Sequence, residues 1–65
     1  MSMQIIFSPG KCITHPASGT IEDVLRELEI NPVDVLISCN GIIIPEDTPA
    51  LDDMTIRIIK ISHGG

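Results

Sequence analysis

Residues 55–61, which read Thr-Ile-Arg-Ile-Ile-Lys-Ile, decide the fold. Isoleucine occupies both odd and even positions of this run, so a strand here presents apolar side chains on both of its faces. A strand that is apolar on both faces belongs inside a sheet and not at its edge. We therefore expect residues 55–61 to form a central strand, placed most economically beside the first strand of the chain.

The start of the chain predicts a hairpin. Residues 3–7 alternate apolar and polar side chains, which is the pattern of a half-buried strand. The turn-forming residues 8–10, Ser-Pro-Gly, follow, and residues 11–15 form a second short arm that ends at Pro16. Two short strands joined by so tight a turn are expected to pair with each other.

A second hairpin is predicted around Asn40-Gly41. Both of these residues accept positive φ, so the pair is a strong signal for a two-residue hairpin turn. The turn joins a strand over 35–39 to a returning arm over 42–44. Residues 46–53 contain Pro49 and a cluster of acidic residues, so we expect a loop there, with at most a short turn of helix.

One helix is predicted between the two hairpins. Apolar side chains recur at the i, i+3, i+4 and i+7 positions of a single helical face: Ile21, Val24, Leu25 and Leu28. Thr20 is placed to cap the first turn, and Asp23 stands where a capping box would have Glu or Gln. Pro32 disfavours helical geometry at the residue before it, so we expect the helix to end there.

The predicted order is therefore hairpin, helix, hairpin and long strand. A single helix covers only one face of a sheet, which predicts an α+β layer structure. We expect one domain over residues 1–61 and a flexible tail over 62–65. The core is expected to be aliphatic, because the chain has no Trp, no Tyr and a single Phe, Phe7.

Composition and charge exclude several classes of function. Nine acidic residues against four basic ones give a net charge of −5, which argues against a nucleic-acid partner. No apolar run approaches the roughly 18 residues of a membrane span, and the first residues lack the pattern of a signal peptide. We expect a cytoplasmic protein without a membrane partner. Two cysteines, Cys12 and Cys39, are expected to be small buried thiols in a reduced compartment.

The sequence gives little support for a metal site or for catalysis. Cys12 and His15 fall on opposite faces of one strand, and Cys39 is expected to face the core, so a zinc site that includes His63 is disfavoured. We expect His15 to be a solvated residue at a strand end. No Ser-His-Asp set, reactive Cys-His pair or glycine-rich phosphate loop is present. We therefore predict no enzyme activity, no metal and no cofactor.

The residues after the last predicted strand, Gly64-Gly65, suggest a chemical role. Glycine has no side chain, so two terminal glycines could pass through a narrow channel into the active site of another protein. The terminal carboxylate would then be the reactive group that is delivered. A frayed tail without a function is the alternative interpretation.

Several features of the sequence, taken in order, resemble one family. They are Met3-Gln4-Ile5-Ile6-Phe7, Thr20-Ile21 followed by Val24-Leu25, Asn40-Gly41 with Ile44-Pro45 beyond it, and Ile56-Arg57-Ile58-Ile59-Lys60-Ile61 before Gly64-Gly65. Together they resemble the ubiquitin-like sulfur carriers, small proteins that serve thiamin and molybdopterin synthesis. The resemblance covers almost the whole chain.

This resemblance implies a ubiquitin-like β-grasp fold, in which one helix packs across a mixed sheet of four to five strands. It also implies that an E1-like adenylating enzyme, which itself binds the ATP, activates Gly65, and that a sulfur donor converts the carboxylate to a thiocarboxylate. A sulfur-accepting synthase would take the sulfur, first of all in thiamin (thiazole) synthesis. Molybdopterin synthesis, tRNA thiolation and conjugation to lysines as a protein modifier remain alternatives.

One stretch departs from the family pattern. The family usually has Asp-Gly-Asp before its last strand, and this chain has Asp52-Asp53-Met54. We expect the turn to survive, because aspartate tolerates left-handed backbone geometry better than most residues. The contacts of the family's second acid are in doubt, because Met54 stands in its place.

Side-chain parity predicts a partner-binding patch on the sheet face that the helix leaves open. Odd positions of the first strand and of the strand over 35–39 are assigned to the core, and this leaves a group of residues pointing the other way: Ile6, Leu36, Arg57, Ile59 and Ile61. An exposed apolar group of this kind usually marks a protein interface. Self-association through the same patch is the alternative.

Overall fold

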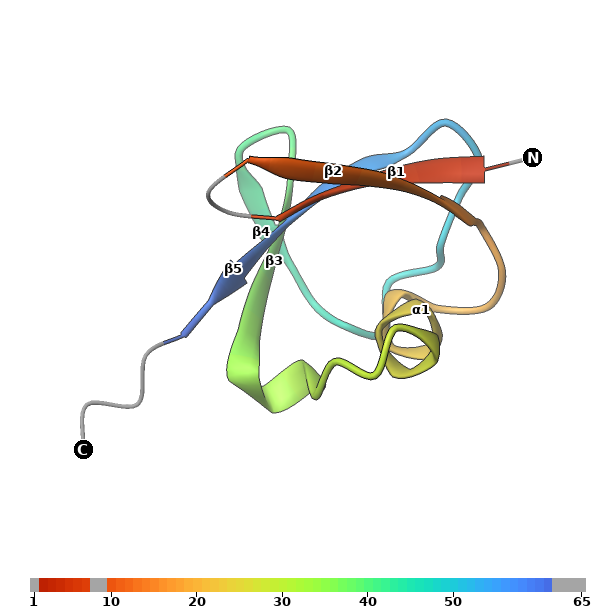
Figure 1. Cartoon of the computed structure of the whole chain (residues 1–65). Helices are drawn as coiled ribbons and strands as arrows, with labels where there is room; N and C mark the ends of the chain where they lie inside the picture. The colour runs from red at the N-terminus through yellow and green to blue at the C-terminus, as the bar shows by residue number, and fades with distance from the viewer. Residues whose placement is uncertain (1, 8–9, 62–65) are drawn as a thin grey trace.

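The computed structural model describes residues 2–7 and 10–61, which form one α-helix, a short 3-10 helix and a five-stranded mixed sheet (Figure 1). The elements in chain order are β1 (Ser2–Phe7), β2 (Lys11–Pro16), α1 (Ile21–Glu27), η1 (Pro32–Asp34), β3 (Val35–Cys39), β4 (Ile42–Ile44) and β5 (Thr55–Lys60). The strands lie in the order β2-β1-β5-β3-β4. This arrangement confirms the expected α+β class.

Strand β5 is the central strand of the sheet, as its two apolar faces predicted. It pairs in parallel with β1 and antiparallel with β3. Ile56 and Ile58 are buried in the core that the sheet shares with α1. The strand ends at Lys60, one residue earlier than expected, yet the amide of Ile61 still donates to the carbonyl of Asp34 at 2.8 Å.

Both predicted hairpins are present. β1 pairs antiparallel with β2, and β3 pairs antiparallel with β4. Asn40 and Gly41 have φ values of 53° and 80°, which is the positive geometry that the second turn requires. The loop over 46–53 contains no helical turn in the described chain, and its carbonyls accept hydrogen bonds from the amides of Ile21 and Glu22 at 2.9 and 2.8 Å. The loop thereby satisfies two amides at the start of α1 that have no partner within the helix.

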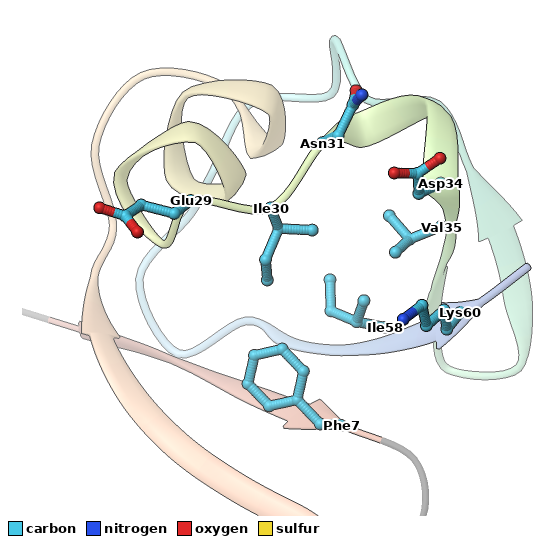
Figure 2. A pocket seen from close by; sticks show the side chains of 8 residues that line it. All are labelled: Phe7, Glu29, Ile30, Asn31, Asp34, Val35, Ile58 and Lys60. Atoms are coloured by element: carbon cyan, nitrogen blue, oxygen red, sulfur yellow. The ribbon is translucent and has the colours of Figure 1, made fainter.

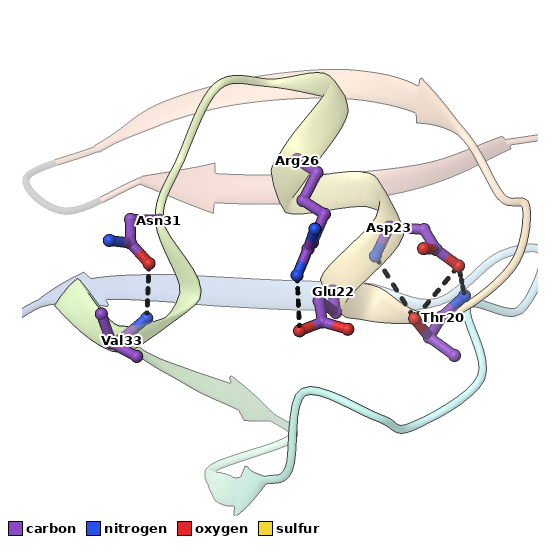
Figure 3. Close-up of polar contacts among 6 residues, drawn as sticks. All are labelled: Thr20, Glu22, Asp23, Arg26, Asn31 and Val33. Carbon is purple, nitrogen blue, oxygen red and sulfur yellow. Dashed lines mark hydrogen bonds and ion pairs between the residues drawn. The ribbon is translucent and has the colours of Figure 1, made fainter.

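Helix α1 begins with the predicted capping box (Figure 3). The Thr20 hydroxyl oxygen accepts from the Asp23 amide at 3.3 Å, and the Asp23 carboxylate accepts from the Thr20 amide at 3.0 Å. Aspartate therefore takes the place that Glu or Gln usually has in this motif. One turn later, exposed Arg26 donates to Glu22 at 3.4 Å.

The helix ends earlier than the sequence predicted. We expected it to continue up to Pro32, but its last residue is Glu27. The chain reverses at Glu29, which has φ of 62°, and the amide of Ile30 donates to the carbonyl of Leu25 at 2.8 Å. This is the long hydrogen bond of a Schellman motif, in which the left-handed position is usually glycine.

Pro32 begins a new element and does not end the old one. It is the first residue of η1, whose start is capped by Asn31: the Asn31 side-chain oxygen accepts from the amide of Val33 at 3.2 Å (Figure 3). Proline suits the first position of a helix because its missing N–H has no partner there in any case.

The core lies between α1 and one face of the sheet. It is aliphatic, as expected, and its buried members come from β1, α1, β3 and β5: Met3, Ile5, Ile21, Val24, Leu25, Ile37, Ile56 and Ile58. In the part of the chain that the structure describes, no helix is long and apolar enough to cross a membrane.

Candidate partner-binding face

The sheet face turned away from α1, here called the far face, carries a continuous row of side chains. Residues directly opposite each other in neighbouring strands point to the same side of a sheet. The pairing places one row across all five strands, from edge to edge: Cys12, Ile6, Arg57, Ser38 and Ile43. This row is the centre of the candidate site.

The predicted patch residues from the strands do lie together. Ile6 is directly opposite Arg57, and Leu36 is directly opposite Ile59. Arg57 is exposed and Leu36 is 43% exposed, whereas Ile6, Ile59 and Ile61 are half-buried. Ile61 comes directly after β5 and extends its pairing with the chain before β3. The far face therefore combines apolar area with one exposed cation.

One large member of this face, Ile43, was not predicted from the sequence. It is 56% exposed and lies opposite Ser38. Three successive isoleucines in β4 show no alternation, so composition alone does not say which of them points outward. The signal lay in the turn, because a two-residue loop at Asn40-Gly41 fixes the pairing of the residues on either side.

The expectation for Cys12 was wrong. We expected two buried thiols, but Cys12 is exposed, and only Cys39 is partly covered. Cys12 pairs with Ile6 on the far face of β2, an edge strand that no other element of the described chain covers on that face. Both cysteines are free.

The expectation for His15 was also wrong. Its side chain is only 15% exposed, because His15 pairs with Met3 and shares the helix side of the sheet. Its Nε2 atom lies 3.9 Å from a carboxylate oxygen of Glu27 on α1. Cys12 and His15 do lie on opposite faces, as predicted. Within residues 2–7 and 10–61, no three His, Cys, Asp or Glu side chains come together to hold a metal ion.

The turn before β5 has a non-glycine residue at its left-handed position. Asp53 adopts the expected left-handed geometry, with φ of 64°. Its amide donates to the carbonyl of Ser2 at 2.9 Å, and the amide of Gln4 donates to the carbonyl of Met54 at 2.8 Å. These bonds fix the start of β5 beside β1.

The far face contains a groove of about 220 Å³ beside the Asn40-Gly41 turn. Arg57 lies in its wall with Ile6, and the polar groups of Ser38 and Thr55 also line it. An arginine carries a rigid, planar fork of donors that matches a carboxylate. The groove therefore offers one cation, hydroxyl groups and an apolar side.

A larger hollow of about 380 Å³ lies on the other side of the sheet, where α1 ends (Figure 2). Four apolar side chains point toward one another inside it, and four polar ones stand around them: Phe7, Ile30, Val35 and Ile58, then Glu29, Asn31, Asp34 and Lys60. The described residues of its lining carry no thiol, hydroxyl or imidazole group. Its four apolar side chains suit contact with an apolar side chain of a partner.

The remaining candidate residues from the sequence, Gly64 and Gly65, lie outside the described residues, as do His63 and the whole tail over 62–65. No protein-family model matches this chain, and no curated protein matches it at a significant level. The described part of the candidate site is therefore the far face with its groove.

Proposed function

We propose that this protein is a sulfur carrier. An ATP-dependent activating enzyme adenylates the carboxylate of Gly65, and the product is converted to a thiocarboxylate that donates its sulfur, with thiazole formation in thiamin synthesis as the first candidate pathway. The observation that carries the proposal is the strand order β2-β1-β5-β3-β4 with α1 across one face, which is compatible with the ubiquitin-like β-grasp fold.

The position of β5 supports this role. β5 is hydrogen-bonded on both sides, and Ile61 is tied to Asp34, so the chain leaves the sheet from a rigid point. Gly64 and Gly65 follow that point within four residues. A rigid body followed by a short segment suits the delivery of a carboxylate into the active site of a partner that docks on the sheet.

The proposed chemistry needs no catalytic group on this chain. The Gly65 carboxylate attacks the α-phosphate of ATP on the partner, which releases pyrophosphate and forms an acyl adenylate. Hydrosulfide (HS⁻) supplied by the sulfur donor then attacks the carbonyl carbon, AMP leaves, and loss of one proton gives the thiocarboxylate. Glycine leaves that carbon open to attack because it has no side chain.

Removal of Gly65 tests the proposal directly. We predict that a chain lacking Gly65, or carrying Gly65→Trp, loses ATP–pyrophosphate exchange with the activating enzyme while its urea unfolding curve is unchanged, since the core lies within residues 3–58. Exposed Asp52→Asn serves as the control and should retain exchange. Exchange by the shortened chain at the normal rate would refute the proposal.

The intact mass of the protein from its native host separates the related functions. Replacement of one oxygen by sulfur at Gly65 supports the carrier. Conjugates of higher mass that survive reduction would instead identify a ubiquitin-like modifier attached to lysines. A chain that stays unmodified under every growth condition would identify an interaction module with an inert tail.

We also propose that the activating enzyme docks on the far face. Ile59 is half-buried there beside exposed Leu36, and apolar groups of this kind usually belong to interfaces. Ile59→Asp is expected to leave the monomer folded and to weaken binding to the enzyme by about tenfold or more, as a buried unpaired charge would. Unchanged affinity in a titration calorimetry experiment would exclude this docking surface.

A further inference from the structure

The charges of this protein are divided between the sheet and the rest of the chain. None of the nine acidic residues lies in a β-strand; all of them lie in α1, in η1 or in loops. Three of the four basic residues lie in strands: Lys11, Arg57 and Lys60. The sheet of a protein with net charge −5 is therefore cationic.

Arg57 is the strand cation that points to the far face. Lys11 pairs with Phe7, and Lys60 pairs with Val35, so both belong to the helix side of the sheet. Arg57 instead pairs with Ile6 and Ser38. It is exposed, and it makes no ion pair or side-chain hydrogen bond with any residue in 2–7 and 10–61. Among the described residues of this acidic protein, no carboxylate pairs with Arg57.

The surroundings of Arg57 define what it could bind. The groove of about 220 Å³ places the Ser38 and Thr55 side chains near the arginine and puts Ile6 in its wall. A carboxylate can pair with the guanidinium through two parallel hydrogen bonds and accept others from hydroxyl groups. Ile59 and Leu36, next along the far face, would contact apolar neighbours of that carboxylate.

We propose that the activating enzyme inserts an Asp or Glu side chain, flanked by apolar residues, into this groove and pairs it with Arg57. The inference rests on the proposed function. A second copy of the chain is a poorer occupant, because two far faces placed together would bring two arginines into contact without any strand carboxylate between them. A single cation beside an apolar wall also suits one carboxylate better than a polyphosphate.

The test uses the full chain and the adenylating enzyme purified from the same host, with the dissociation constant measured at low and at high salt. Arg57→Gln is expected to weaken binding by about tenfold or more at low salt and to reduce the dependence of affinity on salt. Arg57→Lys keeps the positive charge but loses the planar fork of donors. Its affinity for the enzyme should lie between that of the wild type and that of Arg57→Gln. Lys11→Gln removes the same charge from the other side of the sheet and should bind as the wild type does.

The outcomes separate this inference from the proposed function. If the wild type binds and Arg57→Gln binds equally well with the same salt dependence, the carboxylate inference is overturned and the sulfur-carrier proposal stands. If the wild type does not bind the enzyme at all, both are overturned. If Arg57→Gln instead disrupts a dimer of the free chain in sedimentation, the groove serves a second copy, and the inference is likewise overturned. Urea unfolding of each variant verifies that it is folded.

Discussion

Substitution of Leu25 by alanine tests how strongly side-chain packing holds α1, the only α-helix of the described chain, against the sheet. Leu25 is fully buried and is one of three buried residues through which α1 reaches the sheet, with Ile21 and Val24. The backbone bond from Ile30 to the Leu25 carbonyl does not depend on the side chain, so the variant removes packing alone. Large-to-small changes at such sites cost about 2–5 kcal/mol.

That cost is large for a chain of 65 residues. At about 0.05–0.15 kcal/mol per residue, the whole free energy of unfolding is on the order of 3–10 kcal/mol. Leu25→Ala should therefore lower the midpoint of urea unfolding, followed by circular dichroism, by about a fifth or more. Arg26→Ala is the matched control, because Arg26 is exposed and its pair with Glu22 contributes only about 0.3–0.5 kcal/mol. A loss below about 0.5 kcal/mol for Leu25→Ala would show that this helix face does not pack on the sheet.

Two further substitutions test the ends of the helix. Glu29→Gly should stabilise the protein by about 0.5–1 kcal/mol in urea unfolding, because Glu29 has φ of 62° and glycine has no Cβ that disfavours this geometry. Lower stability of the variant would mean that the Glu29 side chain contributes more than the backbone strain costs. Gly19→Ala should destabilise by about 1–2 kcal/mol, because Gly19 has φ of 69° and its new Cβ would meet the Asp23 carboxylate that caps Thr20. An unchanged melting temperature for Gly19→Ala would show that the capping box tolerates displacement of Asp23.

The elements that the sequence predicted well are those with a simple local or periodic cause. The two-faced pattern of β5 predicted its central place, and Asn40-Gly41 predicted the turn between β3 and β4. The helix start was also readable, because Thr20 and Asp23 stand at the spacing that the motif requires.

The end of the helix could not be predicted in the same way. The left-handed position after the helix is occupied by Glu29, a residue type that does not indicate this geometry in a sequence. Pro32 was interpreted as the end of the helix, but it is the first residue of η1. His15 was misjudged because the sequence does not show that β2 lies close enough to α1 for Glu27 to approach its ring.

The alternation of side chains along each strand predicted that four residues share the far face, and the structure brings them together: Ile6, Leu36, Arg57 and Ile59. The alternation of side chains could not predict that Cys12 is exposed. That depends on β2 being an edge strand with an open face, which is a property of the whole sheet.

The parallel pairing of β1 with β5 has a consequence for how the chain folds during synthesis. Each hairpin, and the helix, is built from neighbours in sequence, but β1 and β3 share no edge, and only β5 joins them. Before β5 has emerged from the ribosome, the two hairpins have no strand between them, and Ile5 and Ile37 lack the residues Ile56 and Ile58 that lie opposite them in the sheet. Contacts between such distant residues form slowly because the intervening loop has to close first. Nascent chains of this protein should accordingly remain sensitive to protease until Thr55–Lys60 has left the exit tunnel, and then become protected in one step.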